Sequence, residues 1–583
     1  MKKIQILLIG LFALGFWSCD LKEEPTDVLE KGKIFKTADA NALEQYCNWF
    51  YPKMIVGHGA PQDYTMGGML NLDADADYML TWEKNDVAFG HNIAPTNAKD
   101  TPWNWEVIRA ANDFLANYNL SPEPQSVKER YAGQVLFFKS WDYFNKVRTY
   151  GDVPWYDEVL TPGEEGLNKG RDSRKVVMDN ILRDINKAIL FLPKKTQVSR
   201  VSKDAALALK ARICLFEGTY RRYHNIDGDV KFLEEAYNAA GELMKAEYGY
   251  ALFTGSKPEK SYYELFIQPN YNGNKEVILS KEYDPAIGKG NNVSRQMDRG
   301  ETPIGMSKEG VENYLSIDGL PYASSPLHAA GEGMIAELRN RDPRLLQTIG
   351  TPEPGEFTYN LNGNRPGIAK IVGVKNNTAI SSTGYCIVKF LNPAEVFSAH
   401  HQGTLDAPIF RYAEILLIRA EAAAELGKDP ELDKTINALR ARVGFNVNLT
   451  AAPATDTRIV SQYPTIKGAA NANLIREIRR ERSIELFGEG VRRDDLMRWA
   501  CGHLLGKERH GMVIDPTLYS ADEVTKLKTA FNVIDITNPI DVYSARYTTK
   551  PIFEAPKNYL FSIPLNELSL NPNLKPNNPG WTN

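Results

Sequence analysis

One stretch of the chain decides its fold, and it reads IRRERSIELFGEGVRRDDLMRW from Ile478 to Trp499. Acidic and basic side chains are nearly balanced in it, which argues against a patch that binds phosphate or nucleic acid. Arg482 and Glu485 stand three residues apart, as do Glu477 and Arg480, so each pair shares one face of a helix. The stretch therefore predicts an ion-pair network that ties this helix to the turn after it, and not a ligand site.

Helical periodicity dominates on both sides of this stretch. Thr37 is expected to cap the first helix, Gly427 to end another, and Asp429-Pro430 to begin the one that follows it. Apolar residues at helical spacing predict helices over residues 38–54, 103–119, 124–147, 173–191, 203–220, 230–247, 412–426, 431–443 and 473–487.

Small residues recur on single faces of two of these helices. Their positions allow neighbouring helices to approach closely, as in stacked helical hairpins. The pattern is a degenerate form of the tetratricopeptide repeat, since the full consensus is absent. The residues are Ala205, Ala208 and Ala211 on one helix and Ala413, Ala420 and Ala424 on the other.

Three regions lack this periodicity. Residues 250–408 are rich in Gly, Pro and Asn, with short β-like runs at 277–279 and 386–390, and the segment after Gly502 is expected to be rich in loops. The third region, residues 56–100, contains Tyr64, Tyr78 and Trp82, and a loop of such length is uncommon unless it is functional. We therefore expect a mainly α fold with a loop-rich region of short strands.

The composition is that of an ordinary globular protein. The chain has 583 residues, of which 43% are hydrophobic and 24% charged, and its formal net charge is −4. This length suits one large domain or two to four smaller ones. A slightly acidic chain gives no reason to expect nucleic-acid binding.

The cysteines do not form a recognisable site. Apart from Cys19, they are Cys47, Cys214, Cys386 and Cys501, far apart and in no Cys-x-x-Cys spacing. This spacing indicates neither a zinc site nor a dense disulfide scaffold. Cys214 lies within an apolar helical pattern and is expected to be a small core residue. No cofactor is expected.

The first residues have the features of a secretory signal. Two lysines precede a charge-free, mostly apolar run from Ile4 to Trp17, and Ser18 stands just before Cys19. Cleavage before Cys19 would leave a thiol and an amine for acylation, and several acyl chains give a stable membrane anchor. The alternative is a signal without lipidation, because the usual lipobox has Leu where this chain has Phe16.

Three segments, in this order, resemble the SusD/RagB family of Bacteroidota outer-membrane lipoproteins. They are RYAEILLIRAEA from Arg411 to Ala422, the stretch 478–499, and Ile563-Pro564 with NPNL at 571–574 and NNPGW at 577–581. Gly151-Asp152-Val153-Pro154 and residues 206–218 fit the N-terminal half of the family. The resemblance covers essentially the whole mature chain.

The resemblance implies a SusD-like fold with tetratricopeptide-like helical hairpins. It also implies a partner, a SusC-like TonB-dependent transporter over which the lipoprotein closes as a lid. The captured nutrient is usually a glycan, an oligosaccharide or polysaccharide. The segment from Asp20 to Glu24 resembles the acidic surface-export tag of such lipoproteins, which implies an outer-membrane protein that faces the exterior.

This resemblance also gives an expected division of the chain. Residues 1–18 are the signal peptide and residues 19–33 a lipidated tether. Residues 34–250 form the N-terminal SusD-like helical half. Residues 251–583 form the C-terminal SusD/RagB half, which carries the variable ligand loops.

A glycan receptor needs flat aromatic rings for the CH-rich faces of sugars and polar side chains for their hydroxyls. Such residues are expected on exposed loops that a rigid scaffold holds in place. Trp103 and Trp105 straddle a helix start, so at least one of them is expected in the core. The candidates come from residues 64–105 and from the middle loop: Asp73, Trp82, Trp103, Asn104, Trp105, Tyr283 and Arg299.

Two alternatives to glycan capture stay open. A peptide-binding RagB-like protein of a peptide importer would use backbone-pairing edges and a polar groove. A surface glycosidase would need two carboxylates about 5 to 10 Å apart. Asp73, Asp75 and Asp77 share one loop and could serve such chemistry, bind calcium or face solvent, whereas His400-His401 lack a spaced third ligand. An enzyme is not expected, because the chain has no nucleophile elbow, phosphate loop or His-Glu-x-x-His.

Overall fold

The computed structural model describes residues 31–59, 68–99, 101–161, 163–299, 303–329, 332–353, 355, 357, 360–361, 365–366, 381–395, 399–468, 471–544 and 547–582. The predicted signal, Cys19, the segment from Asp20 to Glu24, and Tyr64 lie outside these residues. Within the described ranges, no helix is both long and apolar enough to cross a bilayer.

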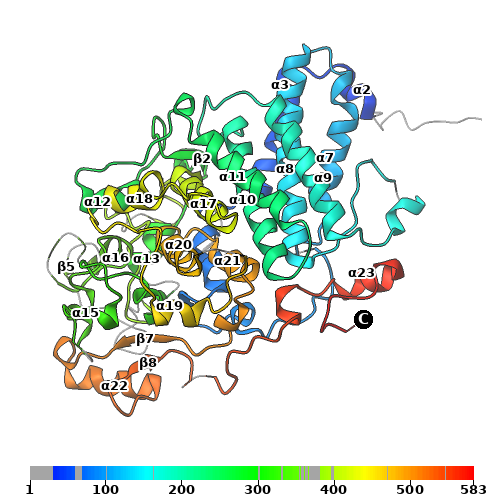
Figure 1. The fold of residues 1–583 in the computed structure, drawn as a ribbon. Helices are drawn as coiled ribbons and strands as arrows, with labels where there is room; N and C mark the ends of the chain where they lie inside the picture. The colour runs from blue at the N-terminus through cyan, green and yellow to red at the C-terminus, as the bar shows by residue number, and fades with distance from the viewer. Residues whose placement is uncertain are drawn as a thin grey trace, which may run out of the picture.

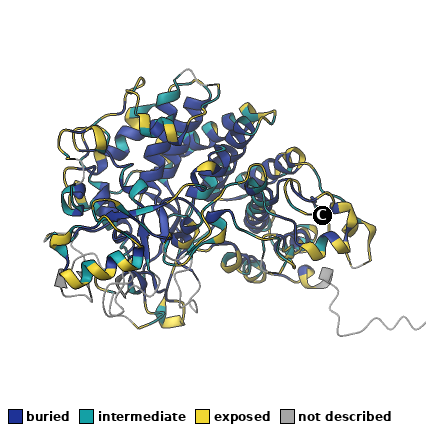
Figure 2. Cartoon of the chain, turned by 90° about the horizontal axis from the view of Figure 1, so that it is seen from below, coloured by how far each residue is buried: buried dark blue, intermediate teal, exposed yellow. Residues whose placement is uncertain are grey.

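A succession of helices forms the scaffold, each packed against the next (Figure 1). Figure 2 shows buried residues concentrated where these helices meet. The arrangement confirms the prediction of a mainly α fold built from stacked hairpins. The helices are α7 (Glu106–Asn117), α8 (Gln125–Tyr150), α9 (Arg174–Phe191), α10 (Lys203–Tyr223), α11 (Asp229–Leu243), α17 (Tyr412–Glu425) and α20 (Ala472–Glu485).

Helices α10 and α11 approach each other closely through small residues. A Cβ atom at Gly218 would lie 2.8 Å from Cγ of Leu233 and 2.9 Å from its backbone nitrogen. Ala205 and Ala236 are also fully buried. The small-residue face predicted on α10 is therefore a packing surface, since any larger side chain would push the helices apart.

Helix starts follow the sequence signals with one exception. Ser173 and Ser202 cap α9 and α10 by accepting hydrogen bonds from Val176 N and Ala205 N. Thr37 is not an N-cap, however. α3 (Ala40–Asn48) is capped by Asp39, whose carboxylate accepts a hydrogen bond from Ala42 N at 2.8 Å. Thr37 instead donates to the carbonyl of Ile34, in the preceding helix α2 (Lys31–Lys36).

The segment after α17 departs from the prediction. Gly427 has a φ of +71°, as its predicted role at the helix end requires. Asp429 accepts a hydrogen bond from Glu431 N in a turn, and Glu431 itself has a φ of +51°. A helix cannot continue through this left-handed conformation, so the predicted helix start at Asp429-Pro430 is wrong. Helix α18 covers only Ile436–Arg442.

The remaining elements are short. Strands form four two-stranded antiparallel sheets among the described residues: β1 (Met79–Thr81) with β3 (Ile304–Met306), β2 (Val277–Lys281) with β6 (Ala407–Arg411), β4 (Asn360–Leu361) with β5 (Arg365–Pro366), and β7 (His510–Val513) with β8 (Pro539–Asp541). The shorter helices are α4 (Phe50–Met54), α5 (Gly68–Leu72), α6 (Asp86–Phe89), α12 (Pro258–Leu265), α13 (Val293–Arg299), α14 (Lys308–Val311), α15 (Met334–Leu338), α16 (Arg344–Thr348) and α19 (Thr457–Gln462).

Of the two β-like runs, only residues 277–279 lie in a strand. Residues 386–390 form a single bridge, between Ile387 and Ile349. Phe390 has a φ of +67°, which no strand accommodates. The predicted strand at 386–390 is therefore wrong.

The charged stretch forms the ion-pair network that its sequence predicts. Arg480 lies 3.3 Å from Glu477 on one face of α20. Arg482 does not bond Glu485, however. It reaches 2.8 Å to Asp495 of α21 (Arg492–Arg498), because Glu485 faces other arginines in the core. The network thus ties α20 to the helix after it through a different pair from the one expected.

The segment after Gly502 contains two further helices, α22 (Ala521–Phe531) and α23 (Leu565–Leu570), within its loops. Figure 1 shows that α23 lies beside the N-terminal helices, far from α22. The carbonyl of Pro95 accepts a hydrogen bond from Leu565 N at 2.9 Å. Contacts such as this one and the packing of α11 against α17 cross the predicted boundary between residues 250 and 251, which stays a prediction.

Two buried histidines give an expected pH dependence of stability. Burial lowers the pKa of His58 and of His224 to about 4, so both rings are neutral in the fold. The unfolded chain, with its ordinary pKa near 6.5, takes up these protons first as the pH falls. The contribution of these two neutral rings to the free energy of unfolding is therefore fully present above pH 6.5 and is lost as the pH falls from about 6.5 to 4.

His224→Phe tests this expectation by urea denaturation at pH 7.5 and pH 5. The variant should lose about 1 to 2 kcal/mol less than the wild type over this interval, because it lacks one of the two protonation sites. The variant lacks the hydrogen bond from His224 to the Met497 carbonyl at both pH values, so this loss does not affect the difference in stability between pH 7.5 and pH 5. Equal losses in the two proteins would show that His224 does not contribute.

Candidate functional site

Two of the predicted ligand residues have structural roles. Asp73 is only 2% exposed, and its carboxylate accepts hydrogen bonds from Gly488 N at 2.6 Å and Arg492 N at 3.2 Å. Tyr283 is 6% exposed, and its hydroxyl accepts from His58 N and donates to the Gly59 carbonyl. Both side chains hold loops against the core and present no surface to a ligand in this structure.

Two others lie in separate places. Trp82 is half-buried, and its ring meets Phe531 of α22 edge-on at 6.1 Å. Arg299 is the last residue of α13, and its side chain lies outside the described residues. The structure therefore does not bring Trp82 and Tyr283 together in one site.

The aspartates near residue 75 are also separated by their partners. Asp77 pairs with Arg492 at 2.8 Å, and Asp75 accepts a hydrogen bond from Asn85 at 2.8 Å. With Asp73 bound to backbone amides, they do not form the carboxylate pair that the glycosidase alternative requires. Among the described residues, no group of His, Cys, Asp and Glu is arranged to hold a metal ion.

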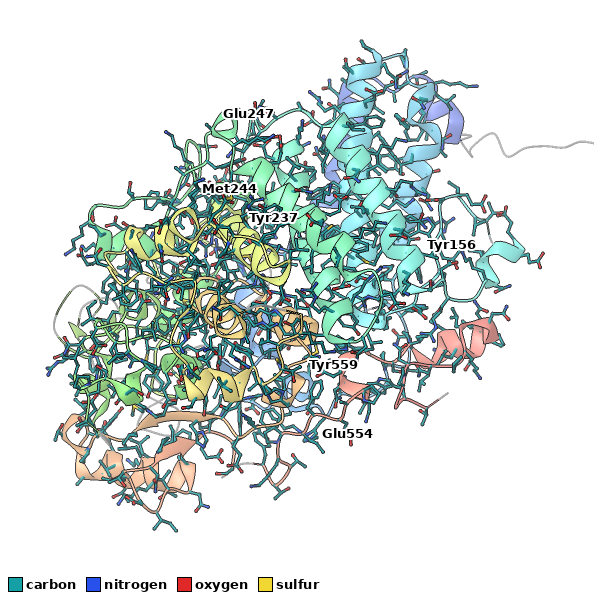
Figure 3. All side chains as sticks on the ribbon, viewed as in Figure 1. Tyr156, Tyr237, Met244, Glu247, Glu554 and Tyr559 are labelled. Atoms are coloured by element: carbon teal, nitrogen blue, oxygen red, sulfur yellow. The ribbon has the colours of Figure 1, made fainter. Side chains whose placement is uncertain are left out.

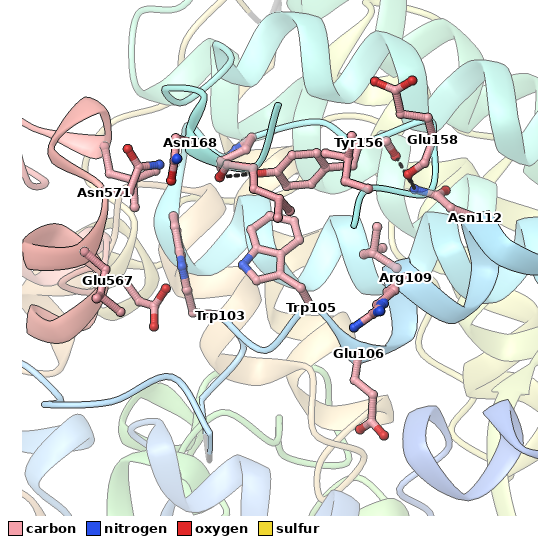
Figure 4. A pocket seen from close by; sticks show the side chains of 16 residues that line it. Trp103, Trp105, Glu106, Arg109, Asn112, Tyr156, Glu158, Asn168, Glu567 and Asn571 are labelled. Atoms are coloured by element: carbon pink, nitrogen blue, oxygen red, sulfur yellow. Dashed lines mark hydrogen bonds between the residues drawn. The ribbon is translucent and has the colours of Figure 1, made fainter. Parts of the chain in front are cut away.

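The remaining three candidates lie together at a cavity of about 500 Å³ (Figure 4). Trp103 and Trp105 line this cavity, and Asn104 lies between them in the sequence. We call it the indole cavity. Its other walls come from α7, from residues 154–160 and 167–168, and from α23 and the residues after it, so segments that are distant in sequence meet here.

The local sequence explains how the two indoles are placed. The side chain of Asn104 accepts a hydrogen bond from Glu106 N at 2.9 Å, which satisfies a free amide at the start of α7. Trp103 and Trp105 therefore flank the helix start on a fixed backbone. Trp103 is 1% exposed and belongs to the core, whereas Trp105 is half-buried, which confirms the expectation that at least one is a core residue.

Trp105 is held by aromatic and cationic neighbours. Its ring meets Tyr156 edge-on at 5.3 Å and Trp103 at 5.7 Å. The Lys146 ammonium group lies 4.9 Å from the Trp105 ring centroid and also donates to the carbonyls of Pro102 and Asn104. The indole is thus rigid, and a rigid aromatic ring is a low-entropy contact surface.

Polar side chains lie near this ring in the wall of the cavity. Asn112 donates to the carbonyls of Tyr156 and Glu158, while its own carbonyl oxygen is buried without a hydrogen-bond partner. Within the described part of the chain, Arg109 and Glu567 form no ion pair. Figure 4 shows Arg109 and Asn112 on the α7 side of Trp105 and Glu567 on the α23 side.

The charge of the cavity is mainly acidic. Burial raises the pKa of Glu567, which has no cation beside it among the described residues. Glu106 pairs with Lys53 at 2.8 Å, and Glu158 is exposed at the rim. Two carboxylates without a cation beside them in the described part of the chain, those of Glu158 and Glu567, therefore accompany one guanidinium, that of Arg109, which favours neutral ligands over anionic ones.

Sequence reasoning found the indoles but missed their polar neighbours. Arg109 and Asn112 lie one turn apart on α7, Tyr156 follows the Gly151–Pro154 turn, and Glu567 is on α23. Only the distance of Arg109 and Asn112 from Trp105 along the helix, four and seven residues, places them on one face with it and could have suggested them.

Comparisons with known proteins agree over the whole chain. A family model described as "SusD family" matches residues 265–581, and one described as "Starch-binding associating with outer membrane" matches residues 31–215. A SusD-like protein P2 of Formosa agariphila is 26% identical over 616 positions that cover all of both chains. The starch-binding protein SusD of Bacteroides thetaiotaomicron is 23% identical over 67% of this chain and 68% of its own.

Solved structures show the same fold. The crystal structure of a SusD-like carbohydrate-binding protein from Bacteroides fragilis matches with a TM-score of 0.71 and 23% identity, covering 93% of this chain and all of the other. A laminarin-binding SusD-like protein matches with a TM-score of 0.57 and 18% identity, covering 94% of this chain and all of the other.

Proposed function

The chain belongs to the SusD family, and from this premise we propose that it captures a glycan at the outer membrane and delivers it to a SusC-like TonB-dependent transporter. The single observation that carries the glycan assignment is the indole cavity. There a rigid indole lies beside the amide of Asn112 and the charged groups of Arg109 and Glu567, which form no ion pair among the described residues. Sugars offer complementary chemistry, an apolar ring face and a rim of hydroxyls.

The relatives support this ligand class. One is named a starch-binding protein, and two of the similar structures are described as carbohydrate-binding and laminarin-binding. Starch and laminarin are neutral glucans, which agrees with the acidic lining of the indole cavity. We propose a neutral oligosaccharide as the ligand.

The location and the partner rest on the sequence and the family. The predicted signal and Cys19 support a lipid anchor, and the model that matches residues 31–215 is described as associating with the outer membrane. The segment from Asp20 to Glu24 supports a position on the outer face. The SusC-like transporter follows from family membership and is a proposal for this chain.

Binding without catalysis is part of the same proposal. The three aspartates that the glycosidase alternative invoked are bound to amides and to Arg492. Peptide capture is the alternative within the family. The described strands lie in two-stranded sheets of at most five residues a strand, which gives a peptide little edge to extend.

Trp105→Ala tests the proposed function. Loss of the ring should weaken binding of a neutral glucan about tenfold or more, since stacking on an aromatic side chain contributes about 1 to 3 kcal/mol. Titration calorimetry with laminarin oligosaccharides and maltoheptaose measures the affinity. Thermal melting of the same samples shows whether the variant is folded.

Trp82→Ala is the matched control, because Trp82 is also half-buried but lies against Phe531 and away from the indole cavity. It should bind with the affinity of the wild type. Glu567→Gln is a second cavity variant that removes no packing, and it should weaken binding if the carboxylate accepts a sugar hydroxyl. Unchanged affinity in both cavity variants would show that the glycan binds elsewhere.

A further inference from the structure

A second cavity, of about 530 Å³, lies on the other side of the segment that carries Trp103. Its walls come from residues 72–75, 92–95, 101–102 and 148–150, the start of α21, and residues 559–562. Figure 3 labels Tyr559, one of its aromatic residues. Tyr150, which also lines it, meets Trp103 edge-on at 5.0 Å, so this indole separates the two cavities.

Arg493 is the distinctive side chain of this second cavity. Its guanidinium makes one protein hydrogen bond, a long one of 3.3 Å to the backbone carbonyl of Asp75. Among the described residues, no carboxylate lies within ion-pair distance of it. The ring of Phe561 lies 5.5 Å away on one side. The half-buried side chain lines the cavity, and its other N–H groups donate to no described protein residue.

The neighbouring arginines show how unusual this is. Arg492 pairs with Asp77 at 2.8 Å, Arg498 with both Glu421 and Asp495, and Arg482 with Asp495. Each of these buried guanidinium groups has a carboxylate partner. Among the described residues, Arg493 and Arg509 lack such a partner, but Arg509 donates hydrogen bonds to the carbonyls of Ala88 and Leu505 and lines a different cavity.

Among the charged groups that line this cavity, Arg493 is the one left to bind an anion. Burial lowers the pKa of Arg493, and the charges of Arg148 and Arg509 act in the same direction, while those of Asp75 and Asp494 oppose them. Asp494 is already paired with Arg148, and Asp75 with the amide of Asn85. Two guanidinium groups, those of Arg148 and Arg493, and two carboxylates, those of Asp75 and Asp494, line the cavity, and only Arg493 among them has no side-chain partner among the described residues.

The rest of the cavity fits a sugar ring. Phe561 and Tyr559 provide aromatic surface, and Ile93 is 84% exposed at its edge. Thr101 and Asn92 add hydrogen-bonding groups. We propose that this cavity binds a carboxylate-bearing sugar, a uronate unit, with its carboxylate on the guanidinium of Arg493. Planar guanidinium and carboxylate groups match in two parallel hydrogen bonds.

This site is complementary to the indole cavity and does not depend on it. The indole cavity has an excess of carboxylates and favours neutral units, whereas the second cavity contains the Arg493 guanidinium, which has no carboxylate partner among the described residues. An acidic unit would therefore be repelled by the first cavity and accepted by the second.

The test is a titration of the folded protein with sodium D-glucuronate and with trigalacturonate, followed by nuclear magnetic resonance or calorimetry. D-glucose, which has the sugar ring but no carboxylate, and sodium acetate, which has the carboxylate but no sugar ring, serve as control probes. Wild-type protein should bind both uronates more tightly than either control, and the affinity should fall as salt is raised. Arg493→Gln should weaken uronate binding at least tenfold. Arg493→Lys should retain part of the affinity, because lysine keeps the positive charge but cannot form the two parallel hydrogen bonds.

Several results would overturn the proposal. They are no uronate binding by the wild type, equal binding by Arg493→Gln, or equal affinity for acetate, which would show a general anion site. Melting temperatures of both variants establish that they are folded. Trp105→Ala separates the two proposals, because it should weaken glucan binding and leave uronate binding unchanged.

Discussion

Glu485→Gln is expected to destabilise the protein by about 3 to 5 kcal/mol, the cost of removing one partner from a buried ion pair. Glu485 is fully buried at the end of α20. Its carboxylate accepts hydrogen bonds from Arg411 at 2.7 Å, from Arg442 at 2.8 Å and from Arg344 at 3.2 Å. The glutamine would leave these three guanidinium groups without their shared anion.

The pKa of Glu485 agrees with this role. Burial by itself would raise it, but Arg442, Arg411 and Arg344 together hold it at about 2. Since the folded pKa lies below the usual value of about 4.5, the carboxylate stabilises the fold above pH 4.5. This contribution is lost as the pH falls from about 4.5 to 2.

Guanidinium denaturation at pH 7 measures the effect. Glu508→Gln is the matched control, because Glu508 pairs with Lys550 at the surface and should contribute less than about 1 kcal/mol. Other carboxylates remain beside the three arginines, among them Glu276 and Glu481. A loss below about 1 kcal/mol in Glu485→Gln would show that these carboxylates replace it fully.

Trp499→Ala is expected to cost about 3 to 5 kcal/mol by opening a cavity in the core. The ring is 1% exposed, and its Nε1 donates to Glu421 at 2.7 Å. The guanidinium groups of Arg479 and Arg498 lie 4.7 and 4.5 Å from its centroid. Truncation therefore removes apolar contacts, a hydrogen bond and two cation–π contacts together.

Trp499→Phe is the conservative partner of this variant. It keeps the aromatic packing and loses the hydrogen bond, so we expect roughly half the loss or less. Denaturation midpoints give the stabilities, and titration with a neutral glucan should show unchanged affinity in any fraction that is folded. If Trp499→Ala melts like the wild type, the indole is not part of the stabilising network.

Helices and their ends were predictable from the sequence where local chemistry decides them. Ser173 and Gly427 act through their own backbone neighbours, so the sequence contains the whole signal. Thr37 and Asp39 are both acceptable caps, and the choice between them depends on where α2 ends. Asp429-Pro430 has the residues of a helix start, but the left-handed conformation of Glu431 prevents a helix from beginning there.

The candidate site was predictable only in part, because its walls meet through tertiary packing. The aromatic residues around the predicted helix start indicated Trp103 and Trp105 as candidates. Asp73 and Tyr283 have the same residue types as ligand-binding side chains, but they satisfy backbone groups in the core. Composition cannot distinguish these roles, since both need a polar group at a fixed place.

The position of α23 has a consequence for how the protein acquires its activity. One wall of the indole cavity is formed by residues 567–574 and another by residues 103–112, so more than four hundred residues separate them in the sequence. Contacts at such separation form late, after the entropy of closing the loop has been overcome. A ligand that touches both walls favours the closed arrangement over any partly assembled one. Ligand binding therefore requires the complete fold. A chain in which only the helical scaffold has folded does not yet contain the indole cavity.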